Sequence, residues 1–227
     1  MTQWQAIVFD LDDTLYPEQD FVQSGFQAVA QWADMYLGIS STDGFQTLMR
    51  LHKSGIRGDT FDKWLAVYDC DTSLVTQLVE IYRNAAPSIR PFSDVPSLLC
   101  SLRPYYKLGI VSDGFLDVQR RKLAALNIEH FFDSVVFSDE WGRERWKPHP
   151  HPFEVVCERL EIPCHAAVYV ADNPLKDFVG AKHAGLTTIW STHAQGDYCV
   201  LRPPSRDHEP DYTIDSLRLL SHLLVKQ

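Results

Sequence analysis

From residue 91 onward, short apolar runs alternate with segments whose apolar residues recur at helical spacing. Strands that alternate with helices in this way are typical of a parallel sheet. The apolar runs cover residues 6–9, 108–111, 135–137, 167–170 and 187–190, and a last strand with a helix is predicted within 212–224. The pattern therefore predicts an α/β fold with a doubly wound, Rossmann-like parallel sheet, whose first strand is formed by residues 6–10.

The stretch between the first two predicted strands has no strand pattern. Its apolar residues follow helical spacing over residues 19–86. The pattern predicts an all-helical cap domain of residues 17–90, inserted into a core domain of residues 1–16 and 91–227. Such an insertion could act as a lid. The residues that carry this pattern are Phe21, Phe26, Val29, Trp32, Ala33, Tyr36, Leu37, Phe61, Trp64, Leu65, Val67, Tyr68, Leu74, Val75, Leu78, Val79 and Tyr82.

Composition narrows the possible partners. The 227 residues are 45% hydrophobic and 22% charged, which is enough to bury a substantial core. The formal net charge of -9 disfavours a nucleic-acid partner, because phosphate backbones are held by clustered Lys and Arg. It favours a small ligand or one bridged by a metal. No run approaches the roughly 20 apolar residues of a membrane span, and the first residues lack the basic start of a secretion signal. We therefore expect a cytoplasmic protein with no membrane partner. The sequence does not determine the oligomeric state, and a monomer is one of the possibilities.

Polar residues of complementary chemistry follow the predicted strands. In open α/β sheets, ligands bind in the crevice beyond the carboxyl ends of the strands. We therefore expect a site there. The candidates are Asp10, Asp12, Ser112, Asp113, Gly114, Asp172, Asn173 and Asp177, together with Lys147 ahead of the helix predicted near residues 153–160.

Each candidate taken alone also has an ordinary structural role. Ser112 and Asp172 could cap helices, Lys147 could be a solvated surface amine, and Asp177 could favour a helix dipole. As a set, they favour a functional site. Because successive strand side chains point to opposite faces, Asp10 and Asp12 can share that site only if the strand ends near Asp10 and the chain turns.

Four ordered motifs resemble those of the haloacid dehalogenase-like hydrolase superfamily, in the subclass with an early α-helical cap. Four motifs in order are a specific signal, whereas a single Asp-x-Asp-x-Thr is weak. Two departures from the common pattern occur: Asp113 replaces the usual Asn, and residues 142–146 make the segment before Lys147 longer. The motifs are Phe9-Asp10-Leu11-Asp12-Asp13-Thr14-Leu15, Val111-Ser112-Asp113-Gly114, Lys147-Pro148-His149-Pro150, and Ala171-Asp172-Asn173-Pro174-Leu175-Lys176-Asp177 with Ala181-Lys182-His183-Ala184-Gly185.

The resemblance implies that the Asp10 carboxylate attacks a substrate phosphorus and forms an aspartyl-phosphate, with Mg²⁺ bridging enzyme and phosphate. A hard cation takes oxygen ligands. The expected metal ligands are the side chains of Asp10 and Asp172 and the backbone carbonyl of Asp12. Asn173 or Asp177 would hold a water or orient a ligand.

The resemblance also implies a proton donor. Asp12 would protonate the leaving-group oxygen and then activate the water that hydrolyses the intermediate, which calls for a raised pKa beside other carboxylates. Lys147 would offset the charge of Asp10 and of the transferring group, and Thr14 would support the nucleophile by a hydrogen bond. The expected phosphate-binding residues are Ser112, Asp113, Gly114 and Lys147.

Asp12 favours a phosphatase over a dehalogenase, because a halide leaving group needs no acid. The predicted function is a Mg²⁺-dependent phosphatase of a small phosphorylated metabolite. A phosphomutase uses the same groups and remains an alternative. A non-catalytic phosphate-binding regulator would be expected to lose Asp10, Asp12, Lys147 or Asp172, all of which are present. An acidic interaction module stays a further alternative. The sequence does not identify the substrate.

Overall fold

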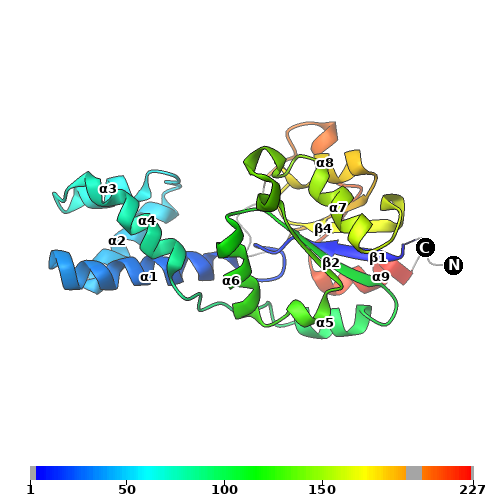
Figure 1. The fold of residues 1–227 in the computed structure, drawn as a ribbon, viewed down its shortest axis with the longest axis horizontal. Coiled ribbons are helices and arrows are strands. Elements are labelled where there is room, and N and C mark those ends of the chain that lie inside the picture. Colours follow the sequence, from blue (N-terminus) through cyan, green and yellow to red (C-terminus); the bar gives the residue numbers. More distant parts are fainter. Residues whose placement is uncertain (1–3, 193–200, 226–227) are drawn as a thin grey trace. The chain divides into compact units, whose positions relative to one another are not determined.

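A parallel sheet forms the centre of the protein's computed structural model, which describes residues 4–192 and 201–225 (Figure 1). Within these residues the sheet has six strands in the order β3-β2-β1-β4-β5-β6. This confirms the predicted α/β fold. The strands are β1 (Ala6–Phe9), β2 (Lys107–Ser112), β3 (Ser134–Phe137), β4 (Ala167–Ala171), β5 (Thr187–Ser191) and β6 (Tyr212–Ile214).

Strand β1 lies in the middle of the sheet because it is apolar and buried throughout. It pairs with β2 on one side and β4 on the other, and Phe9 lies opposite Ile110 and Val170. The carboxyl ends of these three strands therefore reach the same edge of the sheet. The residues that follow them are brought together by this register.

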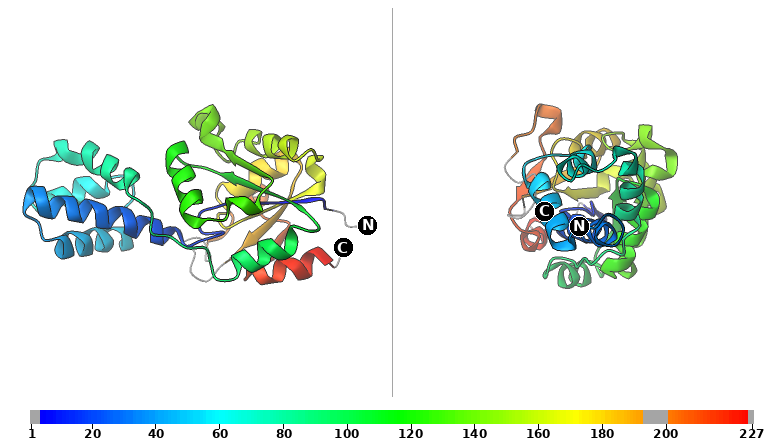
Figure 2. Two further views of the ribbon diagram at one scale, coloured as in Figure 1. Left: turned by 60° about the horizontal axis from the view of Figure 1, so that its bottom comes forward. Right: turned by 90° about the vertical axis from the view of Figure 1, so that its left-hand side faces the viewer.

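Helices cover both faces of the sheet. Helices α7 and α8 lie on one face and α5 and α9 on the other, as Figure 1 and the views in Figure 2 show. Buried apolar side chains of α7, including Phe153 and Val156, join those of the sheet in one core cluster with Phe178 of α8. The helices are α5 (Val95–Leu102), α6 (Leu116–Leu126), α7 (His151–Arg159), α8 (Asp177–Ala184) and α9 (Leu220–Val225).

The described chain divides into two compact units, one of Met1–Glu18 with Arg90–Gln227 and one of Gln19–Ile89. The second unit contains helices and no strand among its residues. Its own core includes Phe26, Leu48 and Trp64, all buried. The helices are α1 (Glu18–Leu37), α2 (Ser41–Lys53), α3 (Thr60–Val67) and α4 (Val75–Asn84).

The chain leaves and re-enters the sheet-containing unit at two neighbouring points. The backbone N–H of Phe92 donates to the carbonyl of Leu15 at 3.0 Å, so the two passages are joined by a backbone hydrogen bond. Within the described ranges, no helix has the length and apolar character that a bilayer crossing requires.

Candidate active site

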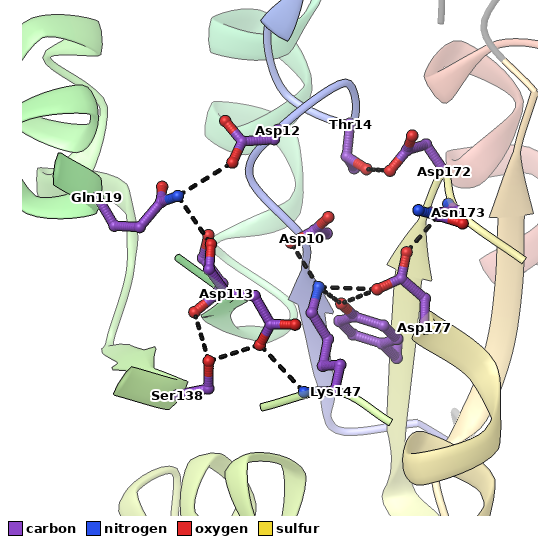
Figure 3. A network of polar contacts seen from close by, with 12 residues as sticks. Asp10, Asp12, Thr14, Asp113, Gln119, Ser138, Lys147, Asp172, Asn173 and Asp177 are labelled. Atoms are coloured by element: carbon purple, nitrogen blue, oxygen red, sulfur yellow. Dashed lines mark hydrogen bonds and ion pairs between the residues drawn. The ribbon is translucent and has the colours of Figure 1, made fainter. Parts of the chain in front are cut away.

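One pocket of the sheet-containing unit gathers the polar residues that follow β1, β2 and β4 (Figure 3). Thr14 and Asp177 are buried beside this pocket. The Thr14 hydroxyl donates to Asp172 Oδ1 at 3.5 Å and not to Asp10, so the expected hydrogen bond to the nucleophile is wrong, because the turn after β1 directs Thr14 toward the end of β4. Asp177 forms an ion pair with Lys147. Buried Ser112 directly precedes Asp113 at the end of β2. The pocket is lined by Asp10, Asp12, Asp13, Glu18, Asp113, Gly114, Gln119, Trp146, Lys147, Asp172, Asn173 and Lys176.

A tight turn after β1 lets Asp10 and Asp12 face the same pocket. The strand ends at Phe9, one residue earlier than predicted, although the Asp10 N–H still donates to the Val170 carbonyl at 2.9 Å. Asp13 then adopts a positive φ of 52°. This left-handed conformation is tolerated by Asp better than by most residues. The turn removes the strand alternation that would separate the two carboxylates.

Lys147 is a fully buried cation held between carboxylates (Figure 3). Its Nζ lies 2.8 Å from Asp10 Oδ1 and 2.7 Å from Asp177 Oδ1, and it donates to the Tyr169 hydroxyl at 3.1 Å. Burial lowers the pKa of Lys147, but the charges of Asp10 and Asp177 outweigh that effect and raise it well above its ordinary value. Lys147 therefore stays charged beside Asp10.

The backbone around Lys147 is fixed by two neighbouring elements. Asp113 Oδ1 accepts from the Lys147 N–H at 3.2 Å and from the Ser138 hydroxyl. On α8, a Cβ at Gly180 would come within 2.3 Å of the Pro148 carbonyl oxygen, so glycine permits this close approach. The Asp that replaces the usual Asn of the second motif thus supports the Lys147 segment.

Asp10, Asp172 and Asp177 form a buried cluster whose carboxylate oxygens lie within 4.8 Å of one another. Burial raises the pKa of Asp10 to about 6, although the Lys147 charge opposes this. Burial, followed by the charges of Asp177 and Asp10, raises the pKa of Asp172 well above its usual range. Among the described residues, Asp172 Oδ2 is buried without a hydrogen-bond partner. The cluster therefore fits a hard divalent cation, which would offset this charge and supply the missing partner.

Ser112 ends β2, and its hydroxyl has no hydrogen-bond partner in the part of the chain that the structure describes. Its Oγ is buried and makes no hydrogen bond to any described residue. Gly114, two residues later, has a φ of +126°, which an L side chain rarely adopts. Native proteins seldom leave a buried hydroxyl unsatisfied, and such a group often marks the position of a ligand or water.

Asp12 contradicts one expectation. Its Oδ1 accepts from Lys122 Nζ at 2.7 Å and from the Tyr16 hydroxyl, and its Oδ2 accepts from Gln119 Nε2 at 3.2 Å. Burial raises the pKa of Asp12, but the Lys122 charge and the hydrogen bonds from Lys122 and Tyr16 outweigh it and lower the pKa. The prediction of a raised pKa is therefore wrong, because it weighed neighbouring carboxylates without a cation that lies 110 residues further along the chain.

The sequence did not indicate several residues that line the pocket or contact its lining residues. Gln119 and Lys122 are spaced three apart on α6 and are buried next to apolar residues of the same helix. Polar residues on an otherwise apolar helix face were an available signal. Lys176 lies inside the fourth motif and lines the pocket, and its charge lowers the pKa of both Asp10 and Asp12. Tyr169 had no such signal, since it reads as an ordinary strand residue.

Comparisons with known proteins agree with the geometry. The family model described as haloacid dehalogenase-like hydrolase matches residues 7–191. The chain is similar to the glyceraldehyde 3-phosphate phosphatase of Methanopyrus kandleri, with 33% identity over 95% of each chain. It is also similar to the pyrimidine 5'-nucleotidase YjjG of Escherichia coli, with 27% identity over 99% of each chain. Among solved structures, the HAD phosphatase from Thermococcus onnurineus has a TM-score of 0.64 and 28% identity, with 97% of each chain covered. The chain thus belongs to the haloacid dehalogenase-like hydrolase family.

Proposed function

We propose that the protein is a Mg²⁺-dependent phosphatase that hydrolyses a small phosphorylated metabolite through an aspartyl-phosphate on Asp10. The observation that carries this proposal is the position of Asp10. Its buried carboxylate lines the pocket 2.8 Å from the Lys147 ammonium and belongs to an acidic cluster suited to a cation. The phosphatase relatives reported above support the same reaction class.

The metal would be held by Asp10 and Asp172, with the backbone carbonyl of Asp12. Asp177 is better suited to orientation than to ligation. Its Oδ1 pairs with Lys147 at 2.7 Å, and its Oδ2 accepts from the Asn173 N–H at 3.0 Å. Bound Mg²⁺ would supply positive charge to the phosphate oxygens and to the crowded carboxylates.

Asp10 is the nucleophile in this proposal. Its carboxylate oxygen forms a bond to phosphorus while the bond from phosphorus to the leaving-group oxygen breaks. The Ser112 hydroxyl, which has no partner among the described residues, donates to a phosphate oxygen. Lys147 holds the Asp10 carboxylate in place and offsets the charge of the transferring group. The backbone N–H groups of Asp113 and Gly114 are further expected donors to the phosphate.

Asp12 is the general acid and then the general base of this proposal. The lowered pKa keeps its carboxylate ionised in the resting protein. A phosphate dianion that enters the pocket adds negative charge nearby and raises the proton affinity of Asp12. Asp12 then takes up a proton from water and passes it to the leaving-group oxygen as the bond from that oxygen to phosphorus breaks. The same carboxylate afterwards takes a proton from the water that attacks the aspartyl-phosphate. That attack releases inorganic phosphate and restores Asp10.

The substrate is expected among small phosphoesters, because the relatives are named for a triose phosphate and for pyrimidine nucleotides. The helical unit is proposed as the cap that the family resemblance implies, and it would set the choice among these substrates. A cytoplasmic location and independence from nucleic acids and membranes remain predictions.

The test is phosphate release from glyceraldehyde 3-phosphate, pyrimidine nucleoside monophosphates and other small phosphoesters, with Mg²⁺ and with a chelator. We expect Mg²⁺-dependent release by the native chain and none by Asp10→Asn, provided that circular dichroism shows the variant is folded. Undiminished release by Asp10→Asn would overturn the proposal. Conversion of a substrate to its phosphate isomer without release would identify a phosphomutase instead.

A further inference from the structure

We propose that Gln119 and Lys122 of α6 are positioning residues that hold the Asp12 carboxylate in the orientation required for proton transfer to the leaving group. The inference rests on the proposed function, since it concerns the same pocket. It assigns roles to two side chains that the family motifs do not include.

Gln119 ties the proton donor to the phosphate-binding segment (Figure 3). Its Nε2 donates to Asp12 Oδ2 at 3.2 Å and to the Asp113 carbonyl at 2.7 Å. Both partners are acceptors, so the amide nitrogen must face them. A Cβ at Gly114 would lie 2.4 Å from this nitrogen, which places the Gln119 amide directly against the turn. One amide therefore sets the position of Asp12 relative to the segment expected to hold phosphate.

Lys122 holds the other oxygen of the same carboxylate. Its Nζ lies 2.7 Å from Asp12 Oδ1, and only 3% of its side chain is exposed. A carboxylate oxygen of Glu18 lies 4.0 Å from the same Nζ. Residues three apart on a helix share a face, so α6 presents Gln119 and Lys122 to Asp12 together. The Tyr16 hydroxyl also donates to Asp12 Oδ1.

These contacts leave Asp12 little freedom. Rotation of its carboxyl group would break hydrogen bonds to both oxygens at once. Proton transfer needs the acid within hydrogen-bond reach of the leaving oxygen, and a misplacement of about 1 Å can cost roughly 100-fold in rate. Burying a lysine is unfavourable unless it is well paired. If the contacts of Gln119 and Lys122 with Asp12 served only stability, apolar residues could replace both side chains without slowing the reaction. This alternative can be tested.

The test compares leaving groups. p-Nitrophenyl phosphate releases a stable phenolate that needs little protonation, whereas an alkyl phosphate needs the acid. The variants are Gln119→Leu and Lys122→Met, and the substrates are p-nitrophenyl phosphate and the most active alkyl phosphate of the panel above. The quantity measured is kcat/KM, which includes the formation of the aspartyl-phosphate and leaving-group departure.

We expect each variant to lose about 10- to 100-fold in kcat/KM for the alkyl phosphate and several-fold less for p-nitrophenyl phosphate. Lys122→Arg, which keeps the charge, should recover much of the loss. Arg120→Met, on an exposed position of the same helix, is the matched control and should alter neither substrate. In an Asp12→Asn background, Gln119→Leu and Lys122→Met should add no further preference for the better leaving group.

An equal loss for both substrates, or a further selective loss in the Asp12→Asn background, would overturn the positioning role. Circular dichroism and thermal melting of each variant separate a folding defect from a defect in proton transfer. The proposed function fails separately, if Asp10→Asn stays active or no alkyl phosphate is hydrolysed. A further outcome is that Asp12→Asn alone lowers kcat/KM more for the alkyl phosphate than for p-nitrophenyl phosphate, with no such difference in either α6 variant. That result would reject the positioning role and leave the proposed function standing.

Discussion

The ammonium group of Lys147 lies 2.7 Å from a carboxylate oxygen of Asp177, and neither side chain is exposed to solvent. Removing one partner of a buried ion pair leaves an uncompensated charge, which typically costs about 3–5 kcal/mol. Because Lys147 keeps Asp10 as a second partner, Asp177→Asn should lower the free energy of unfolding by about 3 kcal/mol. Urea denaturation without divalent cations measures this change.

The matched control for that experiment is Asp59→Asn, which breaks the exposed i,i+4 pair of Asp59 with Lys63 at 3.0 Å. Exposed pairs contribute little to stability. We expect the urea midpoint to stay close to that of the native chain. Similar shifts of the urea midpoint in both variants would show that the buried pair contributes no more to stability than the exposed pair.

Stabilisation by Mg²⁺ should depend on pH. Burial raises the pKa of Asp10 to about 6, above its value in the unfolded chain. Protonation of Asp10 therefore favours the folded state, and this contribution is lost as the pH rises through about 6. Mg²⁺ competes with the proton for the same oxygens. We expect the Mg²⁺-induced rise in melting temperature to be larger at pH 8 than at pH 5.

Thermal melting with and without Mg²⁺ at the two pH values measures this difference. Asp172→Asn serves as the control, because it removes a proposed ligand from the same cluster. The Mg²⁺-induced shift should shrink in that variant at pH 8. An equal Mg²⁺ shift at pH 5 and pH 8 in the native chain would contradict the prediction.

Ser112 and Ser134 allow a paired test of the unsatisfied hydroxyls. In both residues, Oγ is buried and lacks a hydrogen-bond partner among the described residues, but only Ser112 adjoins the pocket. An unsatisfied buried hydroxyl does not contribute a hydrogen bond, so either Ser→Ala change should leave stability unchanged or raise it by about 1 kcal/mol. Ser112→Ala alone should weaken inhibition by inorganic phosphate, roughly 10-fold. Equal inhibition constants in the two variants would argue against a phosphate contact for Ser112.

Lys176 should contribute to substrate binding. It lines the pocket, and its charge acts on Asp10 and Asp12. Hydrogen bonds to charged groups contribute about 1.5–3 kcal/mol, so Lys176→Met should raise KM roughly 10-fold or more. The control is Lys182→Met. Lys182 lies on α8, the helix that begins directly after Lys176, but its ammonium group donates to the Glu209 carbonyl, so KM should stay unchanged. Steady-state kinetics on one substrate decides between these outcomes.

The apolar runs predicted most of the sheet because parallel strands buried on both faces have a continuous signature. Strands β1 to β5 lie at the predicted runs, and β6 lies within the range predicted for the last strand. Fold class follows from such local patterns. The meeting of Asp10 with Asp172 also followed from sequence, because strand ends in a parallel sheet share one edge.

The protonation of Asp12 could not be predicted in the same way. It depends on Lys122 and Gln119, which lie 110 and 107 residues away and reach Asp12 only after α6 has docked. The pKa of a buried carboxylate is a balance of burial against specific charges at short distance. Motif spacing gives the residue types in a pocket but not this balance.

The backbone bond between Phe92 and Leu15 has a consequence for how this family can diversify. It joins the two ends of the long segment between β1 and β2. These ends are therefore held together whatever residues lie between them. We expect this segment to be exchangeable: other helices could be grafted at the same junction to change the choice of substrate, while the pocket residues of the sheet-containing unit stay the same.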